Sequence, residues 1–178
     1  TAAQVRSYLR HRPLIMTTTQ EDAWKELVRY DSMETQDTEV EPAIVQLKTS
    51  HQTGSGIILQ IAEDSFLLST CAHVVEEEPE ITVIFQDGTS VMGTVLERSA
   101  DFDLAFLKVA SQDIPYETRV KLRCARIKEA AWTQLAENDP VFILASSRKP
   151  AGDYYEGYVQ YREIYVPEFD CYMLCIKS

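Results

Sequence analysis

The sequence predicts a mainly β protein with a helical N-terminal extension, and three observations lead to that prediction. From Glu41 onward, short segments rich in Val, Ile, Phe and Thr recur at a spacing of about eight to twelve residues, which is typical of β-sandwiches and β-barrels. The pair Asp87-Gly88 lies between two of these segments and is typical of a hairpin turn. The first forty residues instead carry a helical pattern.

In that extension, taken as residues 1–40, Thr18 and Glu21 form a capping box. Apolar residues then fall on one helical face, and the pattern predicts a helix over 21–30 whose apolar side packs on the rest of the protein. The face consists of Ala23, Trp24, Leu27 and Val28.

Ten strands are predicted after the extension. The first six are 43–47, 56–61, 66–69, 80–85, 90–97 and 103–110, and four more follow at 121–126, 140–145, 155–164 and 172–176. Six strands suffice for a closed antiparallel barrel or a sandwich. Four strands cannot close a comparable barrel. We therefore expect one complete barrel in residues 41–118 and an incomplete second barrel in 119–178.

Composition excludes some classes of partner. The net charge of −11 argues against nucleic acid, because phosphate binding requires a basic surface, and the one basic cluster spans only residues 6–12. No window resembles a spanning helix, and residues 1–12 do not resemble a signal peptide. Because the chain starts at Thr1, residues are expected to precede it. The helical extension and the expected upstream residues are compatible with an extracytoplasmic or membrane-tethered protein.

The four cysteines are too few for a disulfide framework. Cys171 and Cys175 would lie about 13 Å apart on an extended strand, which is too far for a disulfide between them. They also lack the CxxC spacing or the nearby histidine of a metal site. We expect buried free thiols.

His73 and Asp103 are the residues with the clearest catalytic pattern. A histidine acting as a general base is held in one tautomer by a carboxylate, and each of these residues lies at the edge of an apolar, strand-like segment. Either residue alone is also typical of a structural role, the histidine at a barrel rim and the aspartate in a turn before a strand. Asp101 competes with Asp103 and would lie on the same strand face.

Four ordered motifs resemble the trypsin-like serine peptidases, specifically their HtrA-type bacterial branch. They are Thr53-Gly54-Ser55-Gly56-Ile57-Ile58-Leu59, Leu68-Ser69-Thr70-Cys71-Ala72-His73-Val74-Val75, Phe85-Gln86-Asp87-Gly88 and Asp103-Leu104-Ala105-Phe106-Leu107-Lys108-Val109. The segment 136–144 is similar to the strand that opens the family's second barrel. The resemblance implies two six-stranded barrels, protein or peptide substrates and no cofactor. It also implies that His73 is the general base and Asp103 the residue that orients it, whereas Asp101 and Cys71 have no part in the pattern.

The family's nucleophile segment, Gly-x-Ser-Gly-Gly, does not occur in the sequence. Ser111 falls in a connector, Ser146 and Ser147 precede two basic residues at the end of a strand, and Ser178 is the last residue. The expectation is a serine endopeptidase whose serine lies outside these 178 residues, so that the chain alone is inactive.

Two other hypotheses stay open on the sequence. One is a pseudo-protease that acts as a binding or regulatory module, with a partner chain or an oligomer covering the unfinished barrel. The other is an unrelated β-sandwich in which His73 and Asp103 lie far apart.

Overall fold

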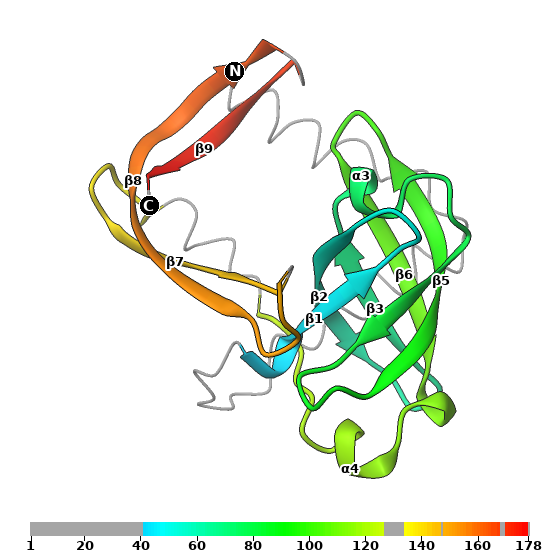
Figure 1. Cartoon of the computed structure of the whole chain (residues 1–178). Helices are drawn as coiled ribbons and strands as arrows, with labels where there is room; N and C mark the ends of the chain where they lie inside the picture. Colours follow the sequence, from blue (N-terminus) through cyan, green and yellow to red (C-terminus); the bar gives the residue numbers. More distant parts are fainter. Residues whose placement is uncertain (1–40, 127–133, 147, 168–169, 178) are drawn as a thin grey trace. The chain divides into compact units, whose positions relative to one another are not determined.

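The computed structural model describes residues 41–126, 134–146, 148–167 and 170–177 (Figure 1). The predicted helix over 21–30 and the basic cluster lie outside these residues. The described chain divides into two compact units. One contains the first six strands together with 142–156, and the other contains most of the last two strands.

The first six strands form a closed antiparallel barrel, which confirms the predicted barrel and rules out the sandwich. Around the barrel the order is β1-β2-β3-β6-β5-β4. The strands are β1 (Ile44–Lys48), β2 (Thr53–Ile61), β3 (Ser65–Thr70), β4 (Glu80–Ile84), β5 (Ser90–Ser99) and β6 (Leu104–Ala110). A 3₁₀ turn, Glu41–Ala43, precedes β1.

Alternating burial explains why these segments form strands. In β4, Ile81 and Val83 are buried while the residues between them are less so, as expected for a sheet with one face on a core. Two bulges, at Ile58/Gln60 and at Val95/Glu97, interrupt the register and help the sheet curve. The inward side chains form one apolar core, whose largest members are Phe66, Phe85, Leu47, Ile58, Leu68, Ile81 and Leu107.

The predicted hairpin turn at Asp87-Gly88 is confirmed between β4 and β5. Gly88 has a φ of 86°, a left-handed conformation that glycine adopts without a steric cost. The Asp87 carboxylate accepts hydrogen bonds from the Thr89 N–H at 3.0 Å and from the Thr118 hydroxyl at 2.6 Å. Because Thr118 is buried in α4 (Tyr116–Arg119), this turn is tied to the helix that follows the barrel.

The predicted strand at 121–126 is wrong. Leu122 is buried, but the neighbouring residues are mostly exposed, so the segment has no alternating apolar face. Its backbone makes isolated hydrogen bonds, from the Arg123 N–H to the Pro42 carbonyl at 3.2 Å and from the Ala125 N–H to the Ile58 carbonyl at 2.8 Å.

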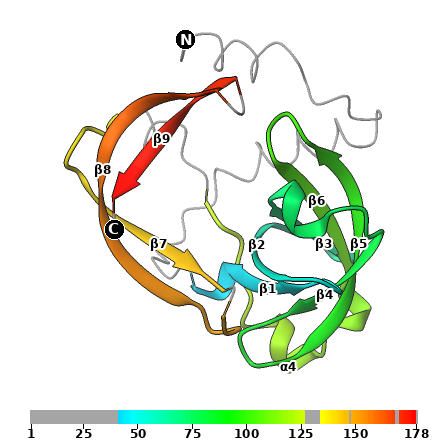
Figure 2. The same cartoon turned by 45° about the horizontal axis from the view of Figure 1, so that its top comes forward.

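A three-stranded sheet contains the remaining strands, with β8 in the middle (Figure 2). They are β7 (Pro140–Ala145), β8 (Asp153–Val166) and β9 (Cys171–Lys177), close to the predicted segments. The β8–β9 pair is antiparallel, with Tyr165 opposite Tyr172 and their ring centres 5.4 Å apart. Several aromatic and aliphatic side chains of this sheet are exposed, namely Phe142, Tyr154, Tyr155, Tyr158, Tyr161, Ile164 and Tyr165.

The cysteines depart from the expected burial. Cys71, Cys124 and Cys175 are free thiols, as expected, but Cys71 and Cys124 are exposed and Cys175 is only half-buried. Cys71 follows the end of β3 and Cys124 lies in the non-strand segment after α4, so neither is on the inner face of the barrel. Among the described residues, none of the helices has the length and apolar character needed to cross a membrane.

Candidate active site

The register of two neighbouring strands assembles the site. β3 and β6 run antiparallel with Thr70 opposite Ala105, so the residues just after β3 lie beside those just before β6. His73 follows the end of β3 and Asp103 precedes the start of β6. The pairing therefore brings together two residues that are thirty positions apart in the chain.

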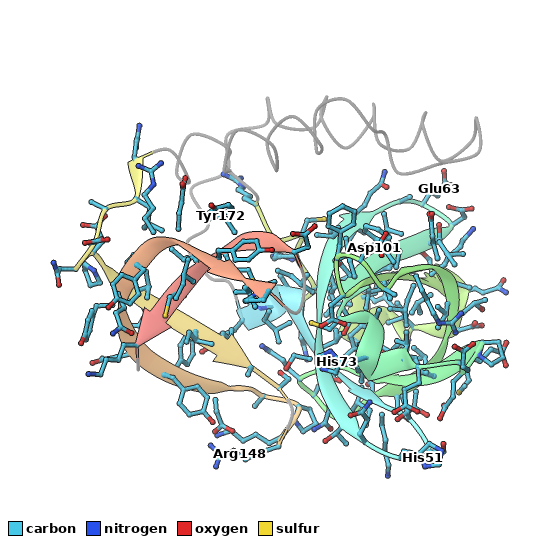
Figure 3. All side chains as sticks on the ribbon, turned by 90° about the horizontal axis from the view of Figure 1, so that it is seen from above. His51, Glu63, His73, Asp101, Arg148 and Tyr172 are labelled. Carbon is cyan, nitrogen blue, oxygen red and sulfur yellow. The ribbon has the colours of Figure 1, made fainter. Side chains whose placement is uncertain are left out.

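His73 lies in a short helix, α3 (Ala72–Val75), and not at the end of a strand as predicted (Figure 3). The apolar run through Val74 and Val75 belongs to this helix, which buries both side chains against the barrel core. Valine favours strands on propensity, so the segment resembles a strand in sequence. Burial of the two valines on one side of a single turn overrides that preference.

Two residues support α3, one in the loop between β1 and β2 and one in β2 itself. The side-chain amide of Gln52 donates to the carbonyl oxygens of His73 and Val74, which have no partner within so short a helix. Gly54 leaves room for the helix, because a Cβ atom there would lie 2.5 Å from Cγ1 of Val74. Neither residue was singled out from the sequence as part of the site.

Asp103 lies in the turn before β6 and not within the strand, which begins at Leu104. Its φ of 49° is a left-handed conformation that aspartate adopts more readily than most residues. One carboxylate oxygen accepts the His73 backbone N–H at 2.9 Å, and the other lies 2.6 Å from Nδ1 of the His73 ring. The carboxylate thus fixes both the backbone and the ring of the histidine.

These contacts set the charge of the pair. Desolvation acts to raise the pKa of Asp103, but hydrogen bonds from the His73 backbone and ring, together with the Cys71 thiol, hold its pKa below the ordinary value. Asp103 is therefore ionised at neutral pH, and Nδ1 of His73 is assigned as the protonated ring nitrogen. The His73 side chain is 65% exposed and that of Asp103 is 23% exposed. Nε2 of the ring is left as the acceptor.

Cys71 is a third member of the cluster that the sequence pattern did not include. It is the N-terminal cap residue of α3, and its thiol hydrogen-bonds to the Asp103 carboxylate. Desolvation, followed by the negative charge of Asp103, raises the pKa of this thiol. Cys71 is thus a neutral thiol at neutral pH. The only sequence signal for it was its position two residues before the histidine.

Among the described residues, the other candidates Asp101, Ser111 and Ser146 lie apart from the pair, whereas Ser147 and Ser178 lie outside the described residues. The carboxylate that His73 contacts belongs to Asp103, so Asp101, in the exposed turn before it, does not take that role and does not share its strand face. Ser111 is buried and donates to the Ala62 carbonyl, and Ser146 is buried and donates to the Pro150 carbonyl. The contact between His73 and Asp103 also rules out the hypothesis that the two residues lie far apart.

A closed antiparallel barrel with a hydrogen-bonded His–Asp pair at one end is an arrangement of the chymotrypsin-type β-barrel proteases. The chain belongs to the trypsin-like peptidase domain family, which matches residues 54–168, more than half of its length. This family assignment agrees with the resemblance that the four sequence motifs carry.

Solved structures support the same fold. Two structures of the HtrA-type protease AlgW with tripeptide, one of them a serine-to-alanine variant, each match with a TM-score of 0.55 and 21% sequence identity. Each match covers 68% of this chain but only 37% of the protease chain. No curated protein matches the sequence.

Proposed function

We propose that the chain supplies the general base and its orienting carboxylate to a trypsin-like serine endopeptidase that acts on proteins or peptides. The observation that supports this most directly is the 2.6 Å contact between Nδ1 of His73 and the Asp103 carboxylate, at the rim of a barrel of the matching family. The exposed face of His73 leaves Nε2 accessible to a nucleophile.

In this mechanism His73 takes a proton at Nε2 from a serine hydroxyl as that oxygen attacks the scissile carbonyl. The imidazolium that forms is stabilised by Asp103, which stays ionised because its pKa is low. His73 then gives the proton to the leaving amine. Asp103 also holds the His73 backbone N–H, so the ring keeps its position while its charge changes.

The serine and the backbone N–H groups that stabilise the oxyanion are assigned to a segment outside these residues. The 178 residues contain no Gly-x-Ser-Gly-Gly sequence, whose glycines let consecutive N–H groups face the reacting carbonyl. The chain also spans 37% of the length of the HtrA-type protease chains that it resembles.

A fluorophosphonate probe, which labels an activated serine, tests this proposal on the natural polypeptide extended beyond Ser178. We expect labelling of the extended polypeptide and none of the 178-residue chain. His73→Gln should abolish labelling, and Asp103→Asn should slow it by about 10³- to 10⁴-fold because the wrong tautomer is favoured. Asp101→Asn is the matched control and should leave the rate unchanged.

Labelling of the 178-residue chain alone would overturn the assignment of the serine to another segment. An extended polypeptide that folds but is not labelled would identify the protein as a pseudo-protease. Equal loss of labelling in Asp101→Asn and Asp103→Asn would overturn the role given to Asp103.

A further inference from the structure

Three side chains with metal-binding atoms meet at the end of β3. The Cys71 sulfur, a ring nitrogen of His73 and a carboxylate oxygen of Asp103 all lie within 4.8 Å of one another. Cys71 and His73 come from the cap and first turn of α3, while Asp103 comes from the turn before β6. The cluster therefore combines two strand ends that the β3–β6 register holds together.

The three donors suit a tetrahedral zinc site. Zinc bonds of about 2.3 Å to sulfur and about 2.0 Å to nitrogen place two such ligands about 3.5 Å apart, so movements of about 1 Å close the cluster around an ion. Cys71 and His73 are exposed and can make that adjustment by rotating their side chains. Their exposure also leaves a fourth coordination position open to water.

We infer that Cys71, His73 and Asp103 together bind a thiophilic divalent cation, Zn²⁺ being the chemically best matched, with water as the fourth ligand. The thiol proton passes to solvent when the sulfur coordinates the ion. The Asp103 carboxylate and the net charge of −11 favour cation binding electrostatically.

Binding of the ion removes the general base, a consequence that rests on the proposed function. Neutral imidazole has one nitrogen with a free lone pair. If the ion takes Nε2, that nitrogen cannot accept the serine proton. If the ion takes Nδ1, the hydrogen bond to Asp103 is lost and Nε2 carries the proton. Either way the ion inhibits hydrolysis reversibly, and a chelator restores it.

Co²⁺ replaces Zn²⁺ as a visible probe in the test, because a cobalt–thiolate bond produces a charge-transfer absorption band. The 178-residue chain, reduced and free of metal, is titrated with Co²⁺ and then with competing Zn²⁺. We expect the thiolate band to appear and Zn²⁺ to displace it. Cys71→Ser should remove the band, and His73→Gln should weaken Zn²⁺ affinity by at least about tenfold.

Two matched variants control for other donors. Cys124→Ser removes another exposed cysteine, and His51→Gln removes an exposed histidine on a different loop (Figure 3). Both should keep the band and the affinity, and circular dichroism verifies that every variant keeps its fold. A missing band in the unsubstituted chain, or a band that survives Cys71→Ser, would overturn the inference.

The two proposals fail separately. The cobalt spectrum requires only the three ligands, so it is unaffected if the extended polypeptide proves to have no peptidase activity. An active peptidase that shows no cobalt–thiolate band would retain the proposed function and contradict the metal site.

Discussion

At the scale of single residues, Gly54 controls where His73 lies. Its Cβ position is occupied by Val74 of α3, with 2.5 Å and 2.8 Å to the two methyl carbons. Any side chain at this position pushes α3 away from β2. Because His73 is in the same helical turn, a displacement of α3 also moves the ring relative to Asp103.

We predict that Gly54→Ala lowers the free energy of unfolding by about 1–3 kcal/mol, the usual cost of overpacking. Urea unfolding measures the change. Val74→Ala removes the two methyl carbons that the new Cβ meets. When Gly54→Ala and Val74→Ala are combined, the free energy of unfolding should therefore fall by less than the sum of the two single decreases, and the difference should be about 0.5 kcal/mol or more. Strict additivity would show that the predicted clash is absent.

The sequence identified the residues whose chemistry is distinctive and missed those that act through shape or through a backbone contact. His73 and Asp103 could be paired because a base requires a carboxylate and because the motifs occur in a familiar order. Gln52 and Gly54 could not, since their roles depend on the carbonyls and methyl groups of a helix that the sequence pattern presented as a strand. Cys71 was visible only as a cysteine near a histidine.

At the scale of secondary structure elements, the hairpin between β4 and β5 and the helix α4 are joined by one buried hydroxyl. Thr118 donates to Asp87 at 2.6 Å and also hydrogen-bonds to the hydroxyl of Thr89 at 2.8 Å. This hydrogen bond from Thr118 is the main reason that the pKa of Asp87 lies below its ordinary value, even though desolvation opposes it.

We predict that this contact makes stability depend on acid pH. Since the pKa of Asp87 is lower in the folded state, its contribution is full above the unfolded pKa of about 3.9 and is lost as pH falls through the folded pKa. From about pH 7 to about pH 3, the free energy of unfolding should therefore fall less in Thr118→Val than in the unsubstituted chain.

Urea titrations at the two pH values measure that difference, and Thr94→Val, at an exposed position of β5, is the control. Other carboxylates also lose favourable contacts in acid, so the comparison between variants isolates the hairpin. An identical pH dependence in Thr118→Val and the unsubstituted chain would contradict the assigned role of Thr118.

Segments in which buried and exposed residues alternate regularly could be predicted as strands, and a segment without that alternation could not. β4 and the Asp87-Gly88 turn carry a clear period of two and the residue type that the turn requires, so both could be predicted. The segment 121–126 has one buried apolar residue, Leu122, between charged ones. Its composition resembled a strand, but within the part of the chain that the structure describes no strand edge provides a ladder of hydrogen bonds for it.

At the scale of the whole molecule, the barrel is closed unevenly. β1 and β4 are paired only at Gln46–Ile84, Leu47–Val83 and Lys48–Thr82, whereas β3 and β6 are paired along the full length of β3. Opening the barrel between β1 and β4 therefore breaks the fewest interstrand hydrogen bonds. The β3–β6 pair, which carries the site at its end, is the better protected part.

Hydrogen exchange followed by mass spectrometry tests this unevenness. We predict that peptides covering β1 and β4 exchange faster than peptides covering β3 and β6 under native conditions, because partial opening costs less free energy than global unfolding. Equal protection of the two pairs would show that the barrel opens only as a unit.

The strand register that pairs Thr70 with Ala105 also determines when His73 and Asp103 become aligned. His73 and Asp103 are brought into alignment when the barrel folds, so the entropy lost in ordering them belongs to folding and not to assembly with another segment. A nucleophile-bearing segment added in trans would meet a preorganised partner and lose only its own freedom. Under the proposed function, the chain is thus suited to split-enzyme complementation, in which two separate polypeptides restore one hydrolase.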